Sequence, residues 1–379
     1  MKQATLKLAA VVILIGGTTM VKAQSISDKT NNVVTTAVPM LRISPDARST
    51  GMGETGIATS ADAYSNFWNL GKTPFAKQKG SIGVTYTPWL NDLNLKDVYI
   101  ASLAGYYKLD DNQALSIGLR YFSLGDIQFT DQSGQDLGSN RPREYTVEGG
   151  YSRKLGPKSG LGIGVRYISS NLANGTYNGV NYKKGSSVAA DLHFFHNGAA
   201  ENGEGFNYGI TLSNLGSKIS YTDDNAQKDF IPANLGLGGA YTKVFDADSK
   251  LTFAVDLNKL LVPTPDTAAA SIASYRSQSV VSSWGKSLVN APGGGSEKIR
   301  EVTASIGAEY WYKEQFAFRA GYFYESPLKG NRRYATVGAG LKYNVIGLNL
   351  SYIFPSGSGI SRNPLSNTVR FSLLFNIDN

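Results

Sequence analysis

The sequence contains no cysteine, which excludes disulfides, thiol chemistry and anchoring as a lipoprotein. It has only two histidines, His193 and His196, whose spacing would place them on opposite faces of a strand, which argues against a zinc site. After residue 23, no apolar run approaches the length that a membrane-spanning helix needs. The net charge of +8 over 379 residues is too small an excess to indicate nucleic-acid binding.

Residues 1–23 have the pattern of a secretory signal peptide. Lys2 and Lys7 supply positive charge, residues 8–20 are mainly apolar, and Ala23 ends a small-residue cleavage site. The apolar stretch is too short to span a bilayer. We therefore expect export and removal of this segment.

From residue 79 to residue 379, apolar and polar side chains alternate in about fourteen segments of roughly 9–13 residues, which predicts strands long enough to cross a membrane when tilted. The expected strands lie near 80–88, 97–108, 115–121, 143–154, 161–167, 185–196, 205–213, 233–244, 251–258, 300–312, 315–326, 336–343, 345–354 and 369–377. Together they predict an all-β protein of antiparallel strands.

The connections between these segments alternate between short and long. The connection 109–112 is short, whereas 125–142 and 259–299 are long; 196–204 and 327–331 fit this rhythm less well. Outer-membrane barrels have tight periplasmic turns and longer outer loops. The rhythm therefore predicts a transmembrane β-barrel in the outer membrane, with its short turns facing the periplasm.

The two faces of the expected strands fit a barrel better than a soluble β-sandwich. Tyrosines gather near both ends of the strands, as in the aromatic girdles that contact outer-membrane lipid. The polar face is rich in glycine and carries charges of both signs, namely Arg120, Arg166, Arg319, Lys342 and Arg370 with Glu148, Asp191, Asp256 and Glu309. A sandwich face in bulk water would not need so many glycines.

Residues 24–78 precede the first strand, and 40–75 do not alternate. Ser60 can cap a short helix from Ala61 to Trp68. Because this segment is tethered to the first strand, we expect it to fold into the barrel as a plug. A plain periplasmic extension is the alternative.

The run Ser44-Pro45-Asp46-Ala47-Arg48, followed by Gly51-Met52-Gly53, Asp62-Ala63 and Trp68-Asn69, resembles the PorV family of type IX secretion proteins, a branch of the FadL-like barrels. The plug residues that carry this resemblance are Asp46, Arg48, Gly51, Met52, Gly53, Trp68 and Asn69. The chain departs from the family pattern at Asn69-Leu70-Gly71, where Asn-Pro-Ala is usual.

The resemblance implies a FadL-like barrel with a short N-terminal helical plug and no enzymatic activity or cofactor. It also implies partners. A PorV-like protein binds the C-terminal signal domain of exported cargo at the translocon barrel SprA (Sov). It then carries the cargo to the PorU-containing attachment complex at the cell surface.

The connection 259–299 is the longest and is unusually apolar for an exposed loop. Its apolar residues are Leu260, Leu261, Val262, Tyr275, Val280, Val281, Trp284, Leu288 and Val289, and Trp89 of the first outer loop could join them. Exposed apolar patches mark interaction sites, where Trp and Tyr are typical anchors. We therefore predict a partner-binding surface here. Packing of the loop on its own barrel, with Trp89 in the aromatic girdle, is the alternative.

Two other functions stay open. A FadL-like transporter of hydrophobic small molecules would need an apolar pocket, for which the candidates are Leu103, Ile168, Phe195, Phe323, Ile353 and Leu374. A barrel-embedded lipid deacylase would need a base, and His193 beside Asp191 is the candidate, although a lumen-facing hydrogen-bonded pair explains them more simply. The glycine run 293–295 lacks the context of a phosphate loop.

Overall fold

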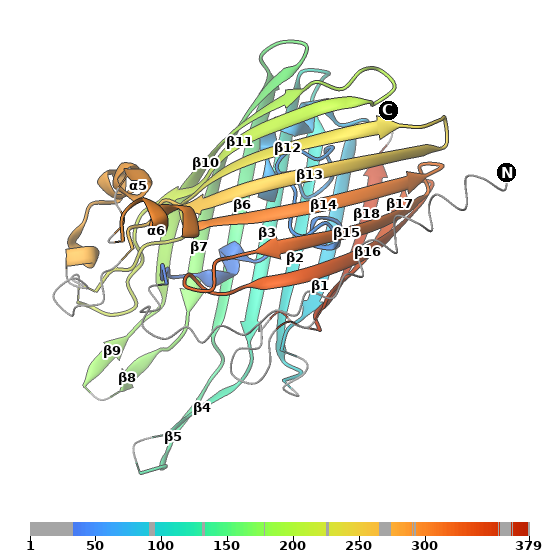
Figure 1. Cartoon of the computed structure of the whole chain (residues 1–379). Coiled ribbons are helices and arrows are strands. Elements are labelled where there is room, and N and C mark those ends of the chain that lie inside the picture. Colours follow the sequence, from blue (N-terminus) through green and yellow to red (C-terminus); the bar gives the residue numbers. More distant parts are fainter. Residues whose placement is uncertain are drawn as a thin grey trace, which may run out of the picture. The chain divides into compact units, whose positions relative to one another are not determined.

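Fourteen antiparallel strands form the wall of a closed barrel (Figure 1). The computed structural model describes residues 33–90, 95–130, 133–177, 179–224, 227–264, 274–289, 291, 293–354, 356, 365 and 367–377. The barrel strands are β1 (Gly80–Pro88), β2 (Val98–Lys108), β3 (Gln113–Leu124), β6 (Arg143–Lys154), β7 (Ser159–Asn171), β10 (Gly185–Asn197), β11 (Gly205–Gly216), β12 (Asn234–Val244), β13 (Ser249–Leu260), β14 (Val302–Tyr312), β15 (Phe316–Tyr324), β16 (Arg333–Tyr343), β17 (Ile346–Ile353) and β18 (Val369–Ile377). The pairing of β1 with β18 closes the ring. The predicted fourteen-stranded barrel is confirmed.

Neighbouring residues of one strand face opposite environments. In β7, Val165 has 58% of its surface exposed, whereas Arg166 is only 2% exposed. Ile117 of β3 and Leu348 of β17 are exposed in the same way as Val165. The exterior therefore presents an apolar band suited to lipid, and the polar, glycine-rich face forms the interior.

The two ends of the barrel differ in their connections. One end carries short turns, the start of β1 and the end of β18, where Gly80 pairs with Ile377. The other end carries the long connections, including 261–301 between β13 and β14. Because outer-membrane barrels place long loops outside, the long-loop end is the outer end.

Two hairpins in the outer loops extend beyond the barrel (Figure 1). They are β4 (Ile127–Thr130) with β5 (Asp136–Asn140), and β8 (Gly175–Tyr177) with β9 (Val180–Tyr182). These hairpins were not predicted from the sequence, because strands of three to five residues are too short to show a period of two.

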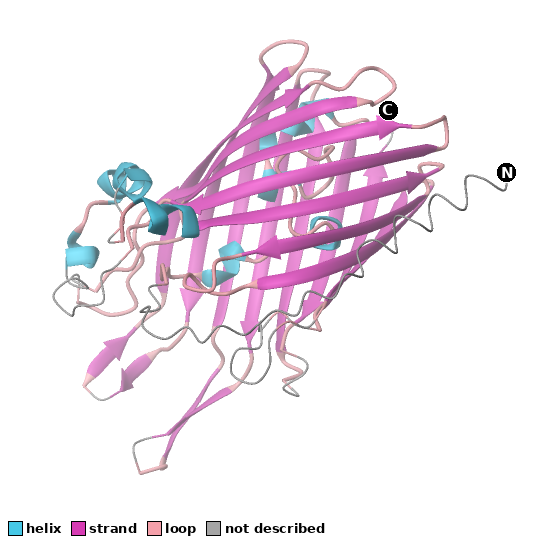
Figure 2. Cartoon of the chain, in the orientation of Figure 1, coloured by secondary structure: helices cyan, strands magenta, loops and turns pink. Residues whose placement is uncertain are grey.

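The segment before β1 lies inside the barrel as short helical turns (Figure 2). These are η1 (Pro39–Arg42), α2 (Ala47–Gly51), α3 (Ser65–Trp68) and η2 (Leu70–Phe75), and we call residues 38–76 the plug. The helix expected from Ala61 to Trp68 does end at Trp68, but its predicted start is wrong, since α3 begins at Ser65 and the Ser60 hydroxyl accepts a hydrogen bond from Arg48. No helix in the described ranges is both long and apolar enough to span a membrane.

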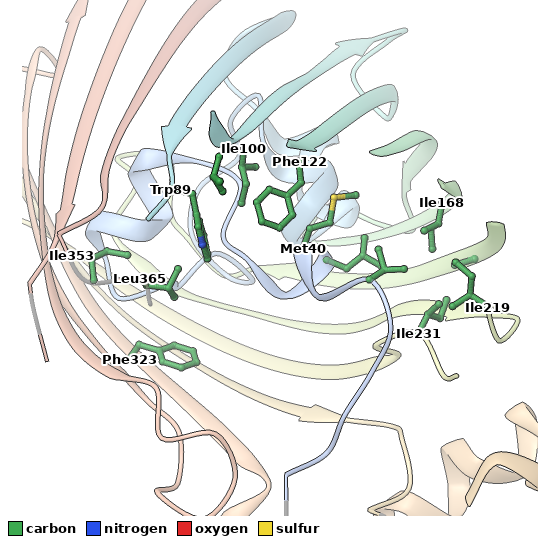
Figure 3. Packing of buried hydrophobic residues seen from close by; sticks show 14 of the residues in the cluster. Met40, Trp89, Ile100, Phe122, Ile168, Ile219, Ile231, Phe323, Ile353 and Leu365 are labelled. Carbon is green, nitrogen blue, oxygen red and sulfur yellow. The ribbon is translucent and has the colours of Figure 1, made fainter. Parts of the chain in front are cut away.

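An apolar cluster joins the plug to the wall and to the outer loops (Figure 3). Met40 of the plug lies among side chains that come from several strands and loops, including Trp89, Phe122, Ile168, Ile219, Phe323 and Ile353. Two further helices, α5 (Val280–Val289) and α6 (Gly295–Arg300), lie in the outer connection between β13 and β14. The outer half of the barrel is therefore packed with the protein's own side chains.

The lipid-facing position Val165 tests this architecture. We expect Val165→Arg to lower the free energy of unfolding by about 2–4 kcal/mol, because it places a charge near the middle of the hydrocarbon. Denaturant titration of the barrel in lipid vesicles measures the change. Val165→Leu is the control and keeps the wild-type value. Equal stability of the two variants would contradict an outward position for this residue.

Candidate functional site: the plug and the outer surface

Asp46 joins α2 of the plug to Trp68 at the end of α3. Its carboxylate accepts a hydrogen bond from the Ser49 N–H at 2.8 Å, as an N-cap does for α2. The other carboxylate oxygen accepts the indole N–H of Trp68, also at 2.8 Å. Both residues were predicted as plug residues, and the structure brings them together.

Arg48 fastens α2 to the barrel wall. Its guanidinium donates two hydrogen bonds to Glu309 of β14, at 2.9 and 2.7 Å, and one to Asp62 at 2.9 Å. Arg319 of β15 donates to the same Glu309 at 2.7 Å. A buried charge is costly unless it is paired, so this network fixes the plug in one position.

The plug backbone lies directly against glycines of the wall. A Cβ added at Gly338 would lie 3.2 Å from Gly51 Cα, and one added at Gly321 would overlap Gly53 N. Gly53 itself has a left-handed φ of 68°, which suits glycine. The glycine-rich inner face therefore has a physical reason, since side chains there would push the plug off the wall.

Asn69 and Leu70 bind the end of the plug to β10. The Asn69 amide donates to the carbonyl of Phe194 at 3.0 Å, and the Leu70 N–H donates to Nδ1 of His193 at 2.9 Å. A proline at position 70, usual in the resembled family, has no N–H and could not make this bond. The departure from the family pattern is thus coupled to a histidine on the facing strand.

The expected Asp191–His193 pair does not form. Asp191 accepts instead from Arg166 at 2.9 Å and from the Asn214 N–H at 2.6 Å. His193, with Leu70 on one ring nitrogen, has Ser213 at 3.4 Å from the other. Across the described ranges, no three His, Asp or Glu side chains come together as metal ligands would.

An ion cluster at the outer end ties the plug to the connection after β15. Glu325 accepts from Arg42 of η1 at 3.0 Å and from Arg332 at 2.9 Å. Burial raises the pKa of Glu325, but the hydrogen bonds and charges of Arg332 and Arg42 outweigh it and hold that pKa below its usual value. Glu325 therefore carries its charge in a buried position.

The prediction of an exposed partner surface is wrong for four of its residues. Leu261, Val262 and Tyr275 are buried, and the last two pack with Val34 and Phe230 in one apolar cluster. Trp89 is buried edge-to-face against Phe122. The outer connection thus packs on its own protein, because Val34 and Phe230, which are distant in sequence, cover its apolar residues.

The other residues of that prediction lie on or beside α5 with mixed exposure. Leu260, Val280 and Trp284 are half-buried, whereas Leu288 is exposed. Ser283 and Ser287 are the buried residues of α5, and Val280 packs against the apolar cluster of Val34 and Tyr275, whereas Val281, Leu288 and Val289 are exposed. The exposed stripe comprises Val281, Leu288 and Val289 of α5 with Ile299 of α6, which is 77% exposed. Ile299 was missed; the helical spacing of 281 and 288 could have shown the stripe.

The six residues proposed for an apolar pocket do not form one. Ile168, Phe323 and Ile353 belong to the outer apolar cluster, Leu374 packs near Tyr64, and Phe195 packs against Phe75. Leu103 was assigned to the wrong face, since its neighbours Ser102 and Ala104 are the buried ones. Two cavities have linings of mixed polar and apolar residues instead: an outer one of about 140 Å³, which Phe323 lines, and an inner one of about 320 Å³, which Phe195 and Leu374 line.

The contact between Gly53 and Gly321 tests how the plug is held. We expect Gly321→Ala to undock the plug while leaving the barrel closed, because the new methyl group would overlap the Gly53 backbone. Single-channel recording in planar bilayers should then show raised conductance. Gly149→Ala, at an outward-facing position with nothing within 4 Å, is the matched control and should conduct like the wild type. A closed G321A channel would show that this contact does not position the plug.

Comparison with solved structures places the barrel among known transporters by fold. The Pseudomonas putida toluene transporter TodX matches with a TM-score of 0.51 and 12% identity, over 88% of this chain and 99% of that one. The Ralstonia pickettii toluene transporter TbuX matches with a TM-score of 0.55 and 13% identity, over 88% and 98%. These identities show a shared FadL-like fold and nothing about substrate.

The chain has no significant match among curated proteins. A family model described as "Type IX secretion system protein PorV" matches residues 26–267, which is more than half of the chain. With the barrel fold, this match confirms the outer membrane as the location. The chain thus belongs to the PorV family of type IX secretion system proteins.

Proposed function

We propose that this protein is a cargo shuttle of type IX secretion. It binds the C-terminal signal domain of exported proteins at the translocon barrel SprA and delivers them to the PorU-containing attachment complex. Family membership already makes it an outer-membrane component of the secretion system and favours a non-enzymatic role. The observation that carries the finer proposal is the exposed apolar stripe at the outer end of a plugged barrel.

The stripe has the properties of a protein-binding surface. Val281 and Val289 are 71% and 61% exposed, and they stand on a helix whose small polar residues face the protein itself. A surface helix is stabilised by turning its apolar side inward, yet in α5 only Val280 and Trp284 are half-buried while the other apolar residues are exposed. An apolar side turned outward suits a partner that covers it.

The loop that carries the stripe is held firmly, which favours binding without a large ordering cost. Glu301, at the end of α6, accepts from Lys259 and from Lys329, and Glu297 accepts from Lys329. Arg276 donates to Asp229 of the neighbouring outer connection at 3.1 Å. Ion pairs thus hold α6 and the residues just before α5, on either side of the stripe.

Transport of hydrophobic small molecules is the second candidate, since TodX and TbuX are toluene transporters with this fold. Its support is weaker here because polar residues line one side of the outer cavity, beside apolar residues such as Leu41, Ile57 and Phe323. Neutral polar side chains from β11 to β14 line it, namely Thr211, Ser213, Asn234, Asn258, Thr303 and Ser305. Toluene gains little from such a lining.

Replacing the stripe tests the proposal. We expect the variant V281S/L288S/V289S/I299S to lose most co-purification with SprA and with exported proteins, because it removes the apolar anchors. Pull-down from detergent-solubilised outer membranes measures the recovery. The control I127S/V180S removes two exposed apolar residues of the β4 and β9 hairpins and should keep wild-type recovery.

Both variants must first migrate as folded barrels on unheated gels, so that misfolding does not imitate lost binding. Undiminished recovery with the stripe variant would refute the partner role of α5 and α6. Toluene uptake by cells carrying this protein, together with undiminished recovery, would favour the transporter instead.

A further inference from the structure

The described chain begins at the outer end of the barrel, although β1 begins at the opposite end. Val34 is buried against Phe230, Val262 and Tyr275, which belong to the outer connections 217–233 and 261–301. The Ala37 N–H donates to the carbonyl of Phe230 at 2.9 Å. The hydroxyl of Tyr275 donates to the carbonyl of Thr35, also at 2.9 Å. We call residues 33–37 the strap.

From the strap the chain descends through the barrel. Arg42 binds Glu325 in the outer connection after β15, and α2 then lies beside β15, β16 and β17. At the other end, the carbonyl of Gln78 accepts from the hydroxyl of Tyr106, and the carbonyl of Lys79 accepts from the Lys108 N–H. The chain therefore enters the barrel from the long-loop side and leaves it on the short-turn side.

The last strand ends on the short-turn side, opposite the strap. Ile377, near the end of β18, pairs with Gly80 at the start of β1. The described N-terminal and C-terminal ends thus open on opposite sides of the membrane. An even number of strands alone would have left the start of β1 and the end of β18 together.

We propose that the strap is displayed at the cell surface as part of the face that a protein partner meets, where it acts as a latch between the outer loops and the plug. This rests on the proposed function, since the stripe on α5 follows Tyr275 in the same connection. A partner that moves this connection would pull on the strap through Tyr275 and Phe230.

The latch is weaker than the plug below it. Within the described part of the chain, residues 33–37 are held by two hydrogen bonds, the buried side chain of Val34 and the half-buried Ala37, whereas Val33 and Thr35 are exposed. The plug is held by the paired charges of Arg48 and by close backbone contacts. Segments with few buried contacts open first, so the strap can detach while the plug stays in place.

Single-cysteine labelling tests the topology, because the chain has no cysteine of its own. The variants are Val33→Cys in the strap, Leu288→Cys on α5, and Leu155→Cys at a short turn, all at exposed positions. We expect a membrane-impermeant maleimide to label V33C and L288C on intact cells. L155C should be labelled only after the outer membrane is permeabilised.

A second set of variants tests the latch. Val34 is buried, so we expect V34C to react about tenfold more slowly than V33C, and Tyr275→Ala to remove most of that difference by releasing the strap. Tyr324→Phe, at an exposed outer position on β15, is the control and should leave the V34C rate unchanged. Equal V34C rates with and without Y275A would overturn the latch.

The topology and the proposed function fail in different ways. If V33C is labelled only after permeabilisation while L288C and L155C behave as expected, the strap does not reach the surface, and the partner role of the stripe stands. If L288C and L155C exchange their behaviour, the barrel has the opposite orientation. In that case both the proposed function and the surface position of the strap would be refuted.

Discussion

Every backbone N–H and C=O that crosses hydrocarbon must find a partner within the protein, and this requirement shapes the whole molecule. The strands meet it by pairing with neighbours on both sides, and the β1–β18 seam removes the last free edge. A ring of fourteen strands leaves a wide interior. The protein fills it with its own N-terminal segment, whose polar groups then need partners as well.

The wall and the plug fit each other, and pair their polar groups, in two complementary ways. Where the backbones touch, as at Gly321 and Gly53, the wall has no side chain. Where they stand further apart, charges reach across, as Arg48 does to Glu309. Asp256 combines a charged side chain of the wall with the backbone of the plug. Its carboxylate accepts hydrogen bonds from the N–H groups of Gly56 and Ile57 at 2.7 and 2.9 Å. The interior is thus a set of matched contacts, which separates this barrel from an open pore.

The wall could be predicted from sequence because its period of two is local. The alternation around Val165 and Arg166 fixes both the strand and the face of each residue. Leu103 shows the limit of this reasoning, since an apolar residue was assigned inward against the parity of its own strand. The presence of a plug was also predictable, from glycines and a family-like motif that do not alternate.

The outer loops were predicted less well, because their structure depends on contacts between distant segments. The burial of Tyr275 requires Val34 and Phe230, and no local pattern joins these three residues. Likewise, Ser60 has the right chemistry for a helix cap, but Arg48 uses its hydroxyl instead. The outward apolar stripe of α5 was predictable in principle, because Val281 and Leu288 are seven residues apart, a spacing that places them on one face of a helix.

The pairing of Gly80 with Ile377 has a consequence for assembly. A chain that passes through a closed ring, with its backbone pressed against the wall at Gly53, cannot be threaded into it afterwards. We therefore expect the N-terminal segment to be inside before the first and last strands pair. Closure of the ring would then be the last step of folding. In that step β18, which is synthesised last, pairs with β1 and encloses the plug, which is synthesised earlier.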